Sequence, residues 1–291
     1  MIDKITKSVT LGISAVLVFG FAGSAIAQQG PAQEITSIKD NIYQFRNRRN
    51  NAVFAVTPDG VILVDSINKE AAEWLKAELK SRFNAEVKYL VLSHDHADHS
   101  SGGEVFADTA IVIAHEQAKA DIIAENRPTA VPNLTYRDTM TIELGGTVAE
   151  LSFVGRNHSD NMTVVRFPAS GVLFAVDFIS VNSIQFADFR DAYIPEWIES
   201  LKRVEAMDFD ILVPGHGRLG NHDSVAIHRG YLEDLQSQVA ALVRQGKTLE
   251  EVQAAVDLTK YKDWRGYERW RDANIAGMYR EVSQHRRPNS G

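Results

Sequence analysis

Hydrophobic and polar positions alternate along the first half of the chain in two periods. Between residues 35 and 66, apolar and polar residues alternate as in strands, with the turn TPDG at residues 57–60. Residues 68–83 place apolar groups at near-helical spacing and predict a helix. The apolar runs EVKYLVLS (86–93) and AIVIAH (110–115) predict buried strands, and a helix is expected from about Glu116.

The second half of the chain repeats this mixture and then becomes helical. Strand-like runs fill residues 139–177, PEWIESLKRVEAM (195–207) predicts a helix, and DILVP (210–214) predicts a short buried strand. From about residue 221 the pattern is helical, and Thr248 with Glu251 forms a capping box. Strands and helices interspersed in both halves predict an α/β fold, a layered sandwich of two sheets covered by helices.

The N-terminal residues follow a different pattern. Two lysines precede an apolar run at about residues 9–22, and an A-x-A sequence follows at 25–27. This order is typical of a secretory signal, so we expect a signal peptide over residues 1–27 and an exported protein, periplasmic in a Gram-negative source. The alternative for this segment is an uncleaved membrane anchor.

Composition limits the partners and the metal ligands. The 291 residues carry a formal net charge of −7 without a long basic run, so no nucleic-acid partner is expected. No cysteine is present, which excludes disulfides and thiolate ligands and leaves His, Asp and Glu to hold any metal. Residues 28–291 are expected to form one domain with a helical C-terminal extension from about 221 to 291, without stable membrane insertion once the signal is cleaved. No oligomeric state is predicted.

Histidines and aspartates gather where one predicted strand ends. The string H-x-H-x-D-H starts at residue 94, and its chance occurrence in one chain is on the order of one in a thousand. His94 and His96 are two apart, so extended backbone puts both rings on one side, where they can grip one ion. Asp98 and His99 follow as the chain turns and can reach a second ion. Imidazole and carboxylate groups suit borderline divalent metals such as Zn²⁺.

Three further candidates, His158, Asp177 and His216, each stand at the end of a downstream strand. We expect one ion to be held by His94, His96 and His158, a second by Asp98, His99 and His216, and Asp177 to bridge them. The alternative is a solvated polar loop. Asp95 is expected to point away from the metals, and the histidines without a partner pattern are expected to be structural or surface residues: His115, His222, His228 and His285.

Four segments, SHDHADHSSGG, NHSDNMTVVRFP, LFAVDF and LVPGHG, resemble in order and spacing the metal motifs of the metallo-β-lactamase superfamily. The resemblance covers about residues 40–220 and implies an αββα sandwich with a dinuclear metal site at one edge of two packed sheets. The second segment looks most like that of the true zinc β-lactamases. Those enzymes usually carry cysteine where this chain has Asp177, and commonly lysine where it has Ser180. An aspartate at 177 looks instead like the glyoxalase II and lactonase branches.

The expected activity is that of an exported hydrolase using two zinc ions. A metal-bound hydroxide would attack an amide or ester carbonyl, with Asp98 and Asp177 as the catalytic carboxylates. A β-lactam is the first candidate substrate. The alternatives are a lactone, a thioester or another ester, an iron-dependent oxidoreductase of the same fold, and a binding module without catalysis. Iron or manganese are alternatives to zinc.

Specificity is expected from loops around the metal edge. The segment RNRRNN (46–51) falls at a strand turn, and the corresponding hairpin loop in the family overhangs the site. Arg46, Arg48 and Arg49 are therefore candidates for attracting an anionic small-molecule substrate, because guanidinium pairs well with carboxylate and phosphate. The alternative is a solvated basic turn. Asn161 and Arg190 are further candidates for contacting the substrate.

Overall fold

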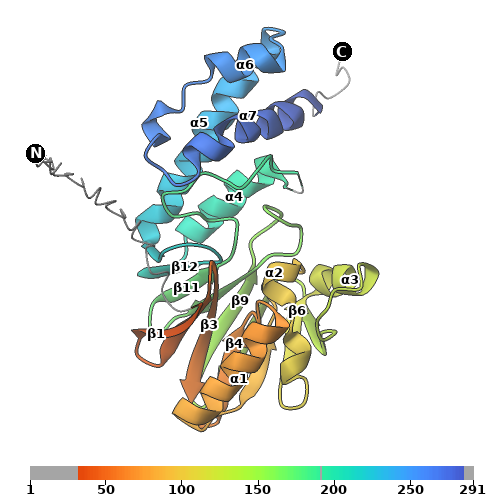
Figure 1. Cartoon of the computed structure of the whole chain (residues 1–291), viewed down its shortest axis with the longest axis vertical. Coiled ribbons are helices and arrows are strands. Elements are labelled where there is room, and N and C mark those ends of the chain that lie inside the picture. The colour runs from red at the N-terminus through yellow and green to blue at the C-terminus, as the bar shows by residue number, and fades with distance from the viewer. Residues whose placement is uncertain (1–31, 191, 285–291) are drawn as a thin grey trace, which may run out of the picture. The chain divides into compact units, whose positions relative to one another are not determined.

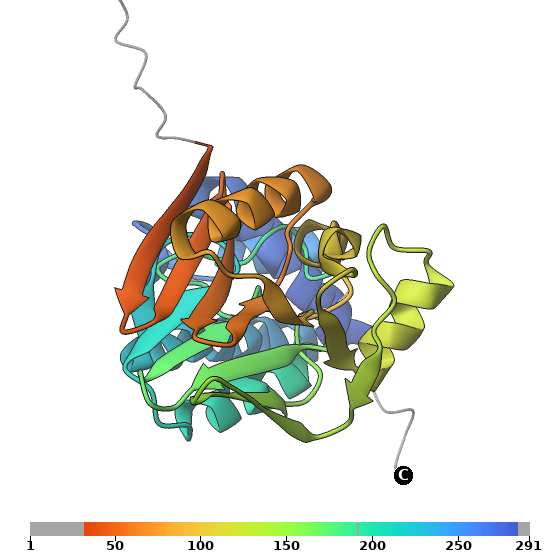
Figure 2. The same ribbon diagram turned by 90° about the horizontal axis from the view of Figure 1, so that it is seen from below.

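Two β-sheets packed face to face form the centre of the computed structural model, which describes residues 32–190 and 192–284 (Figures 1 and 2). The signal peptide predicted over residues 1–27 lies outside the described residues. In the part of the chain that the structure describes, no helix combines the length and the apolarity needed to cross a membrane.

The first sheet has seven strands in the order of the chain. They are β1 Gln33–Lys39, β2 Ile42–Asn47, β3 Asn50–Thr57, β4 Gly60–Val64, β5 Val87–Val91, β6 Ile111–His115 and β7 Leu134–Tyr136. Strands β1 to β4 pair antiparallel, whereas β4 to β7 pair parallel. Because parallel strands end at the same edge of a sheet, the residues that follow β4 and β5 are brought together there.

The second sheet has six strands in the order β13-β12-β11-β10-β9-β8. They are β8 Thr139–Leu144, β9 Thr147–Phe153, β10 Thr163–Phe167, β11 Val172–Ala175, β12 Ile211–Pro214 and β13 Gly220–Asn221. Only β11 and β12 pair parallel within this sheet, so the segments after these two strands also leave from one edge.

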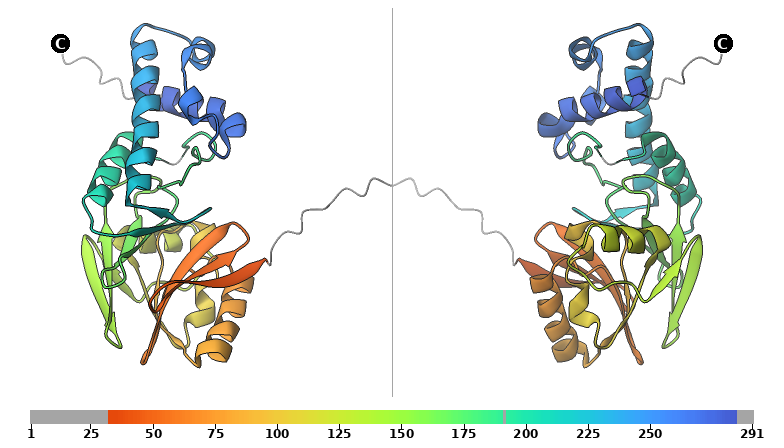
Figure 3. Two further views of the ribbon diagram at one scale, coloured as in Figure 1. Left: turned by 90° about the vertical axis from the view of Figure 1, so that its left-hand side faces the viewer. Right: turned by 90° about the vertical axis from the view of Figure 1, so that its right-hand side faces the viewer.

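Helices cover the outer faces of both sheets. The helices are α1 Lys69–Phe83, α2 Ala97–Ser100, α3 Glu116–Ala124, α4 Ile194–Glu205, α5 His222–Arg244, α6 Leu249–Ala255 and α7 Tyr267–Gln284, with 3₁₀ turns η1 Gly103–Phe106 and η2 Thr259–Tyr261. Helix α1 lies on the first sheet and α4 on the second, and α5 to α7 pack together beyond them (Figure 3). The predicted layered α/β sandwich is confirmed, as is the capping box at Thr248 and Glu251 that starts α6.

Alternation along the strands builds two apolar layers. On β3, Val53 and Ala55 face the second sheet and belong to the core between the sheets. Their neighbours Ala52 and Phe54 face the other way and pack with Leu75 of α1. Successive side chains of a strand point to opposite faces, so a single apolar strand supplies both layers.

A polar clasp joins the two sheets at one edge. Asn51 on β3 is fully buried, and its Nδ2 donates to the carbonyl oxygens of Pro214 at 2.8 Å and of Gly217 at 3.1 Å. Its backbone N–H donates to the carbonyl oxygen of Gly215 at 2.8 Å, and its Oδ1 accepts from Gln44 Nε2 at 2.8 Å. The loop after β12 is therefore fixed against the first sheet.

Removing this clasp should destabilise the fold. Asn51→Ala leaves two carbonyl groups without their side-chain donor, so we expect the free energy of unfolding to fall by about 2 kcal/mol. Urea denaturation followed by circular dichroism measures this. Gln44→Ala, which removes only one contact of the same amide, is the matched control and should cost about 1 kcal/mol or less. Equal unfolding midpoints for Asn51→Ala and the unchanged protein would contradict the assignment.

Candidate metal centre

Seven histidine and aspartate side chains from both sheets meet at the edge where the clasp lies. They form two groups, each with its candidate ligand atoms within 4.8 Å of one another: His94, His96, His158 and Asp177, and Asp98, His99, Asp177 and His216. These are the seven residues singled out in the sequence, divided between two groups as expected. Each stands in a segment that follows a strand, which explains how residues more than 100 positions apart come together.

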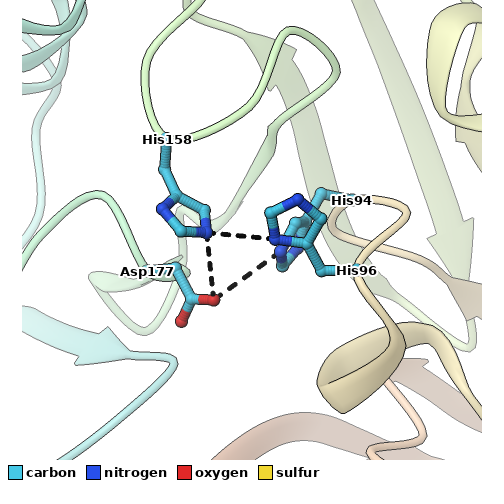
Figure 4. A group of neighbouring side chains, drawn as sticks. All are labelled: His94, His96, His158 and Asp177. Carbon is cyan, nitrogen blue, oxygen red and sulfur yellow. Dashed lines mark hydrogen bonds and ion pairs between the residues drawn. The ribbon is translucent and has the colours of Figure 1, made fainter. Parts of the chain in front are cut away.

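The first group lies between the segments that follow β5, β9 and β11. Figure 4 shows the rings of His96 and His158 and the carboxylate of Asp177 pointing toward one another, with His94 behind His96. His158 Nε2 is 3.1 Å from His96 Nδ1. His94 is fully buried, whereas the side chain of His158 is 30% exposed, so the group opens to solvent on one side.

The second group lies between α2 and the loop after β12. His99 Nε2 is 3.4 Å from His216 Nε2, and His216 Nε2 is 3.3 Å from Asp98 Oδ2. The side chain of Asp98 is 53% exposed, while His99 is fully buried. This group therefore has a buried floor and a carboxylate at its rim.

Asp177 connects the two groups through its two oxygens. Oδ2 lies 3.6 Å from His94 Nε2 and 3.7 Å from His158 Nε2. Oδ1 lies 3.3 Å from His99 Nε2 and 3.2 Å from His216 Nε2. Asp177 follows β11 in a left-handed backbone conformation with φ of 53°, which aims its side chain between the sheets. One carboxylate thus faces ligands of both groups.

Hydrogen bonds behind the rings fix which nitrogen of each histidine carries the proton. Ser93 Oγ donates to Asp65 Oδ2 at 2.8 Å, so it accepts from His94 Nδ1 at 3.0 Å. His99 Nδ1 donates to the same Asp65 oxygen at 3.1 Å, and His216 Nδ1 donates to the carbonyl oxygen of Arg49 at 3.3 Å. In the neutral form of all three rings these contacts favour the proton on Nδ1 and leave the Nε2 lone pair facing the group, the form that metal ligation requires.

Asp65 is a residue of the centre that the sequence pattern did not reveal. It is fully buried after β4, has φ of 67°, and also accepts from the backbone N–H of Ser93 at 2.8 Å. The segment VILVDS places it at a strand end just as LFAVDF places Asp177, and that repeated pattern was the available signal. Burial raises the pKa of Asp65, against the opposing effect of His99 and Ser93. Its contacts orient His99 directly and His94 through Ser93.

The electrostatics of the two groups differ. Burial lowers the pKa of His94 well below its ordinary value and also lowers that of His158, so both stay neutral. Burial opposes charge on His216 as well, but Asp177 and Asp98 outweigh it and raise the pKa of His216 to about 9. His99 is likewise raised well above its ordinary pKa by Asp177 and Asp65 despite its burial. The carboxylates therefore draw positive charge into the second group.

The close approach of the loop after β12 depends on a residue without a side chain. A Cβ atom at Gly215 would lie 2.3 Å from Asp177 Oδ1 and 3.0 Å from His99 Cε1. Any larger residue would push the loop, and His216 with it, away from the second group. The motif PGHG thus brings a ligand-bearing loop against a buried carboxylate.

The residues present fit two divalent cations. His94 Nε2 and Asp177 Oδ1 are buried and make no hydrogen bond with any described residue. Buried polar atoms are normally satisfied, so atoms left open in the middle of converging nitrogen and oxygen donors point to a ligand there. The donor set of imidazole and carboxylate, without thiolate, suits a borderline ion such as Zn²⁺ and equally iron or manganese.

The other predicted site residues lie around this centre in different ways. Arg48 and Arg49 are exposed in the turn between β2 and β3, and the backbone carbonyl oxygen of Arg49 lies 3.3 Å from His216 Nδ1. Arg190 is exposed and pairs with Asp188 at 3.6 Å. Asn161 is 1% exposed, so the expectation that it contacts substrate has no support from its surroundings.

Asn161 instead joins the loops behind the first group. Its Nδ2 donates to Asp95 Oδ1 and to Asp121 Oδ2, both at 2.9 Å, and its Oδ1 accepts from the backbone N–H of Asp95 at 3.2 Å. Asp95 also pairs with Arg127 at 2.8 Å and faces away from both groups. These contacts anchor the backbone between His94 and His96.

The remaining described histidines make structural contacts outside both groups. His115 Nε2 donates to the carbonyl oxygen of Arg137 at 2.9 Å, and His222 Nε2 to that of Glu205 at 2.8 Å. His228 is fully buried beside Gln185, and burial lowers its pKa to about 3. His285 lies outside the described residues.

Known proteins resemble this chain over its sheets and metal edge. It is 26% identical over 215 residues to the metallo-beta-lactamase type 2 of Elizabethkingia meningoseptica, covering 69% of this chain and 86% of that protein. It is 27% identical to the 2,4-dinitroanisole O-demethylase subunit alpha of Nocardioides sp. (strain JS1661), covering 54% and 49% of the two chains. The solved structure of a metallo-beta-lactamase from Pontibacter korlensis aligns with a TM-score of 0.62 at 23% identity, covering 69% of this chain and 99% of that one.

The family model of the metallo-beta-lactamase superfamily matches residues 46–216, a span that begins in β2 and ends at His216. The resemblance predicted from four short motifs is confirmed, because the match contains all seven residues of the two groups. With its αββα sandwich and its edge of converging histidines and aspartates, this chain belongs to the metallo-beta-lactamase superfamily of metal-dependent hydrolases.

Proposed function

We propose that this protein is an exported, dinuclear zinc-dependent hydrolase that opens an amide or ester carbonyl of an anionic small molecule, with a β-lactam as the first candidate. The observation that carries the proposal is the position of Asp177, whose two oxygens face two separate groups of imidazoles. His94, His96 and His158 would hold one ion with Asp177 Oδ2. Asp98, His99 and His216 would hold the other with Asp177 Oδ1.

Two zinc ions held here would lower the pKa of water toward neutrality and stabilise negative charge on a carbonyl oxygen. The protein's own part is positioning. Asp65 and the carbonyl group of Arg49 hold the histidine protons on Nδ1, away from the ligand side. The buried floor formed by His94 and His99 keeps bulk water from that side of the centre.

Asp98 is suited to handle the proton of the reaction. Its side chain is 53% exposed, in contrast to the 7% of Asp177, so it is the carboxylate that faces an incoming substrate. Asn50 Nδ2 fixes its loop by donating to the carbonyl oxygen of Asp98 at 2.8 Å. Its Oδ2 faces His216, which leaves Oδ1 to accept a hydrogen bond from the attacking water and then its proton.

A second candidate is the hydrolysis of lactones, thioesters or other esters. The Elizabethkingia relative is a metallo-beta-lactamase, which favours a β-lactam. Asp177 favours the second candidate. Where zinc β-lactamases usually have the soft thiolate of a cysteine, this chain has a carboxylate that faces both groups. The Nocardioides relative is a 2,4-dinitroanisole O-demethylase subunit, so the proteins similar to this chain are not all β-lactamases. Export, in either case, rests on the N-terminal sequence pattern.

The choice between the two candidates can be made with one substrate panel. The protein without residues 1–27, loaded with zinc, is tested on a chromogenic cephalosporin, an acyl lactone and a thioester, before and after chelation. We expect chelator-sensitive hydrolysis of the cephalosporin. Turnover of only the lactone or thioester would select the second candidate, and turnover unaffected by chelation would contradict both.

Loss of one ligand should remove metal and activity together. His96→Ala deletes the imidazole that faces His158 Nε2 at 3.1 Å. Mutation of a residue that only contacts a metal ligand typically lowers metal affinity or activity about 10- to 100-fold. For the loss of a ligand itself we therefore expect turnover to fall by more than about 100-fold. Metal content is measured by mass spectrometry. His222→Ala, which lies outside both groups, is the control, and full metal content with full turnover in His96→Ala would refute the assignment.

The positioning role of Asp65 has its own test. Asp65→Asn keeps the size of the side chain but removes the charge that accepts from His99 Nδ1 and Ser93 Oγ. We expect zinc affinity, measured by competition with a colorimetric chelator, to fall about 10- to 100-fold. Asp108→Asn, at an exposed carboxylate paired with Lys76, is the control. Unchanged zinc affinity with only a lower melting temperature would mean that Asp65 is merely structural.

A further inference from the structure

Arg265 belongs to the C-terminal part of the chain, yet its backbone is hydrogen-bonded to the segment that follows Asp177. Its N–H donates to the carbonyl oxygen of Asn182 at 3.0 Å. Its carbonyl oxygen accepts from Ile184 N at 3.2 Å and from Ser183 Oγ at 3.1 Å. Residues 182–184 belong to the segment that leaves β11 through Asp177, so Arg265 is joined to the loop that carries the bridging carboxylate.

The guanidinium group of Arg265 lies over the other ligand-bearing loop. A Cβ atom placed on Gly217 would be 3.3 Å from Arg265 Nη2 and 3.7 Å from both Cζ and Nη1. All three atoms lie at contact distance, so the guanidinium covers Gly217, the residue after His216. The cation is therefore held where the loops after β11 and β12 meet.

No carboxylate of the described residues forms an ion pair with this cation. No oxygen of Asp or Glu lies within 4.0 Å of a guanidinium nitrogen of Arg265 among residues 32–190 and 192–284, and its guanidinium donates no hydrogen bond to them. Arg280 of α7, by contrast, pairs with Asp188 at 3.0 Å. Arg265 is exposed, so its donors are presented to solvent at the rim of the site.

Three more arginines, which form no ion pair with any described residue, belong to segments that meet at His216. Arg48 and Arg49 come from the β2–β3 turn, whose backbone accepts from His216 Nδ1, and Arg218 is two residues after the ligand. We call Arg48, Arg49, Arg218 and Arg265 the basic rim. The whole chain has a net charge of −7, so the positive charge at this edge is a local feature that would attract anions.

We propose that Arg265 binds a carboxylate of the substrate and so determines specificity for anionic substrates. The inference rests on the proposed function, because it names the substrate class of the same centre. A guanidinium offers two parallel donors to a carboxylate, and its backbone here is already fixed, so little freedom is lost on binding. The other members of the basic rim steer the anion toward Arg265.

The test compares ligands that differ only in one charge. Two pairs of thiols are titrated calorimetrically into the zinc-loaded protein: mercaptoacetate with mercaptoacetamide, and the longer 3-mercaptopropionate with its amide. A thiolate binds zinc directly, so the affinities can be measured without any turnover. We expect the preferred acid to bind about tenfold or more tightly than its amide, because hydrogen bonds to charged groups are strong. Arg265→Ala should abolish this preference, and Arg265→Lys should keep only part of it.

Arg269→Ala is the matched control, because this nearby arginine is exposed and lies over the ring of Trp270 rather than over Gly217. It should keep the full preference. If the unchanged protein shows no preference for either acid, or if Arg265→Ala retains it, the proposal is overturned. If Arg265→Ala loses the preference but the unchanged protein hydrolyses no substrate of the panel, the role of Arg265 is supported and the proposed hydrolase activity is refuted. If the unchanged protein hydrolyses a substrate but Arg265→Ala keeps the preference, the hydrolase activity is supported and the role of Arg265 is refuted.

Discussion

The carboxylate of Asp177 is the constraint on which the arrangement of the two sheets depends. It is 7% exposed, and a buried carboxylate is costly unless positive charge or donors surround it. Its neighbours are four imidazoles within 3.7 Å, supplied by the segments after β5, β9 and β12 and by α2. Both sheets must therefore pack at this edge in one register for the carboxylate to be compensated, and a pair of divalent cations would compensate it most completely.

The side chains around this carboxylate are held in place by residues from other segments of the chain. Asp65 contacts His99 directly and His94 through Ser93. Asn51 fixes the loop that carries His216 from the second sheet. Gly215 then allows that loop to reach Asp177. Side chains fixed in this way lose little freedom on binding a metal, which is the advantage of building a site on strand ends rather than on a long loop.

The difference between local sequence signals and contacts between distant segments explains what could be predicted from the sequence. The strands, the main helices and the seven residues at the centre were predictable, because hydrophobic periodicity and the string H-x-H-x-D-H are local signals. Asp65 was not, since a single aspartate after a strand has no partner nearby in the sequence and gains its role from contacts 28 and 34 residues away. The burial of Asn161 was not predictable either, since its position in a motif suggested contact with substrate and its contact with Asp95 is 66 residues away in the sequence.

The C-terminal helices, which lie outside the matched family region, also contact the segment that follows Asp177. Asn274 of α7 donates to the carbonyl oxygens of Gln185 at 3.0 Å and Ala187 at 2.6 Å, and a Cβ atom at Gly277 would lie 2.0 Å from the carbonyl oxygen of Asp188. Helix α7 therefore packs directly on the segment that starts at Asp177. Residues 46–216 contain the seven candidate ligands of the two groups, whereas Arg265 lies outside them and is hydrogen-bonded to the segment that follows Asp177. If Arg265 binds the substrate carboxylate, as we propose, changes in the helical extension would alter substrate preference without altering the residues that would hold the metal.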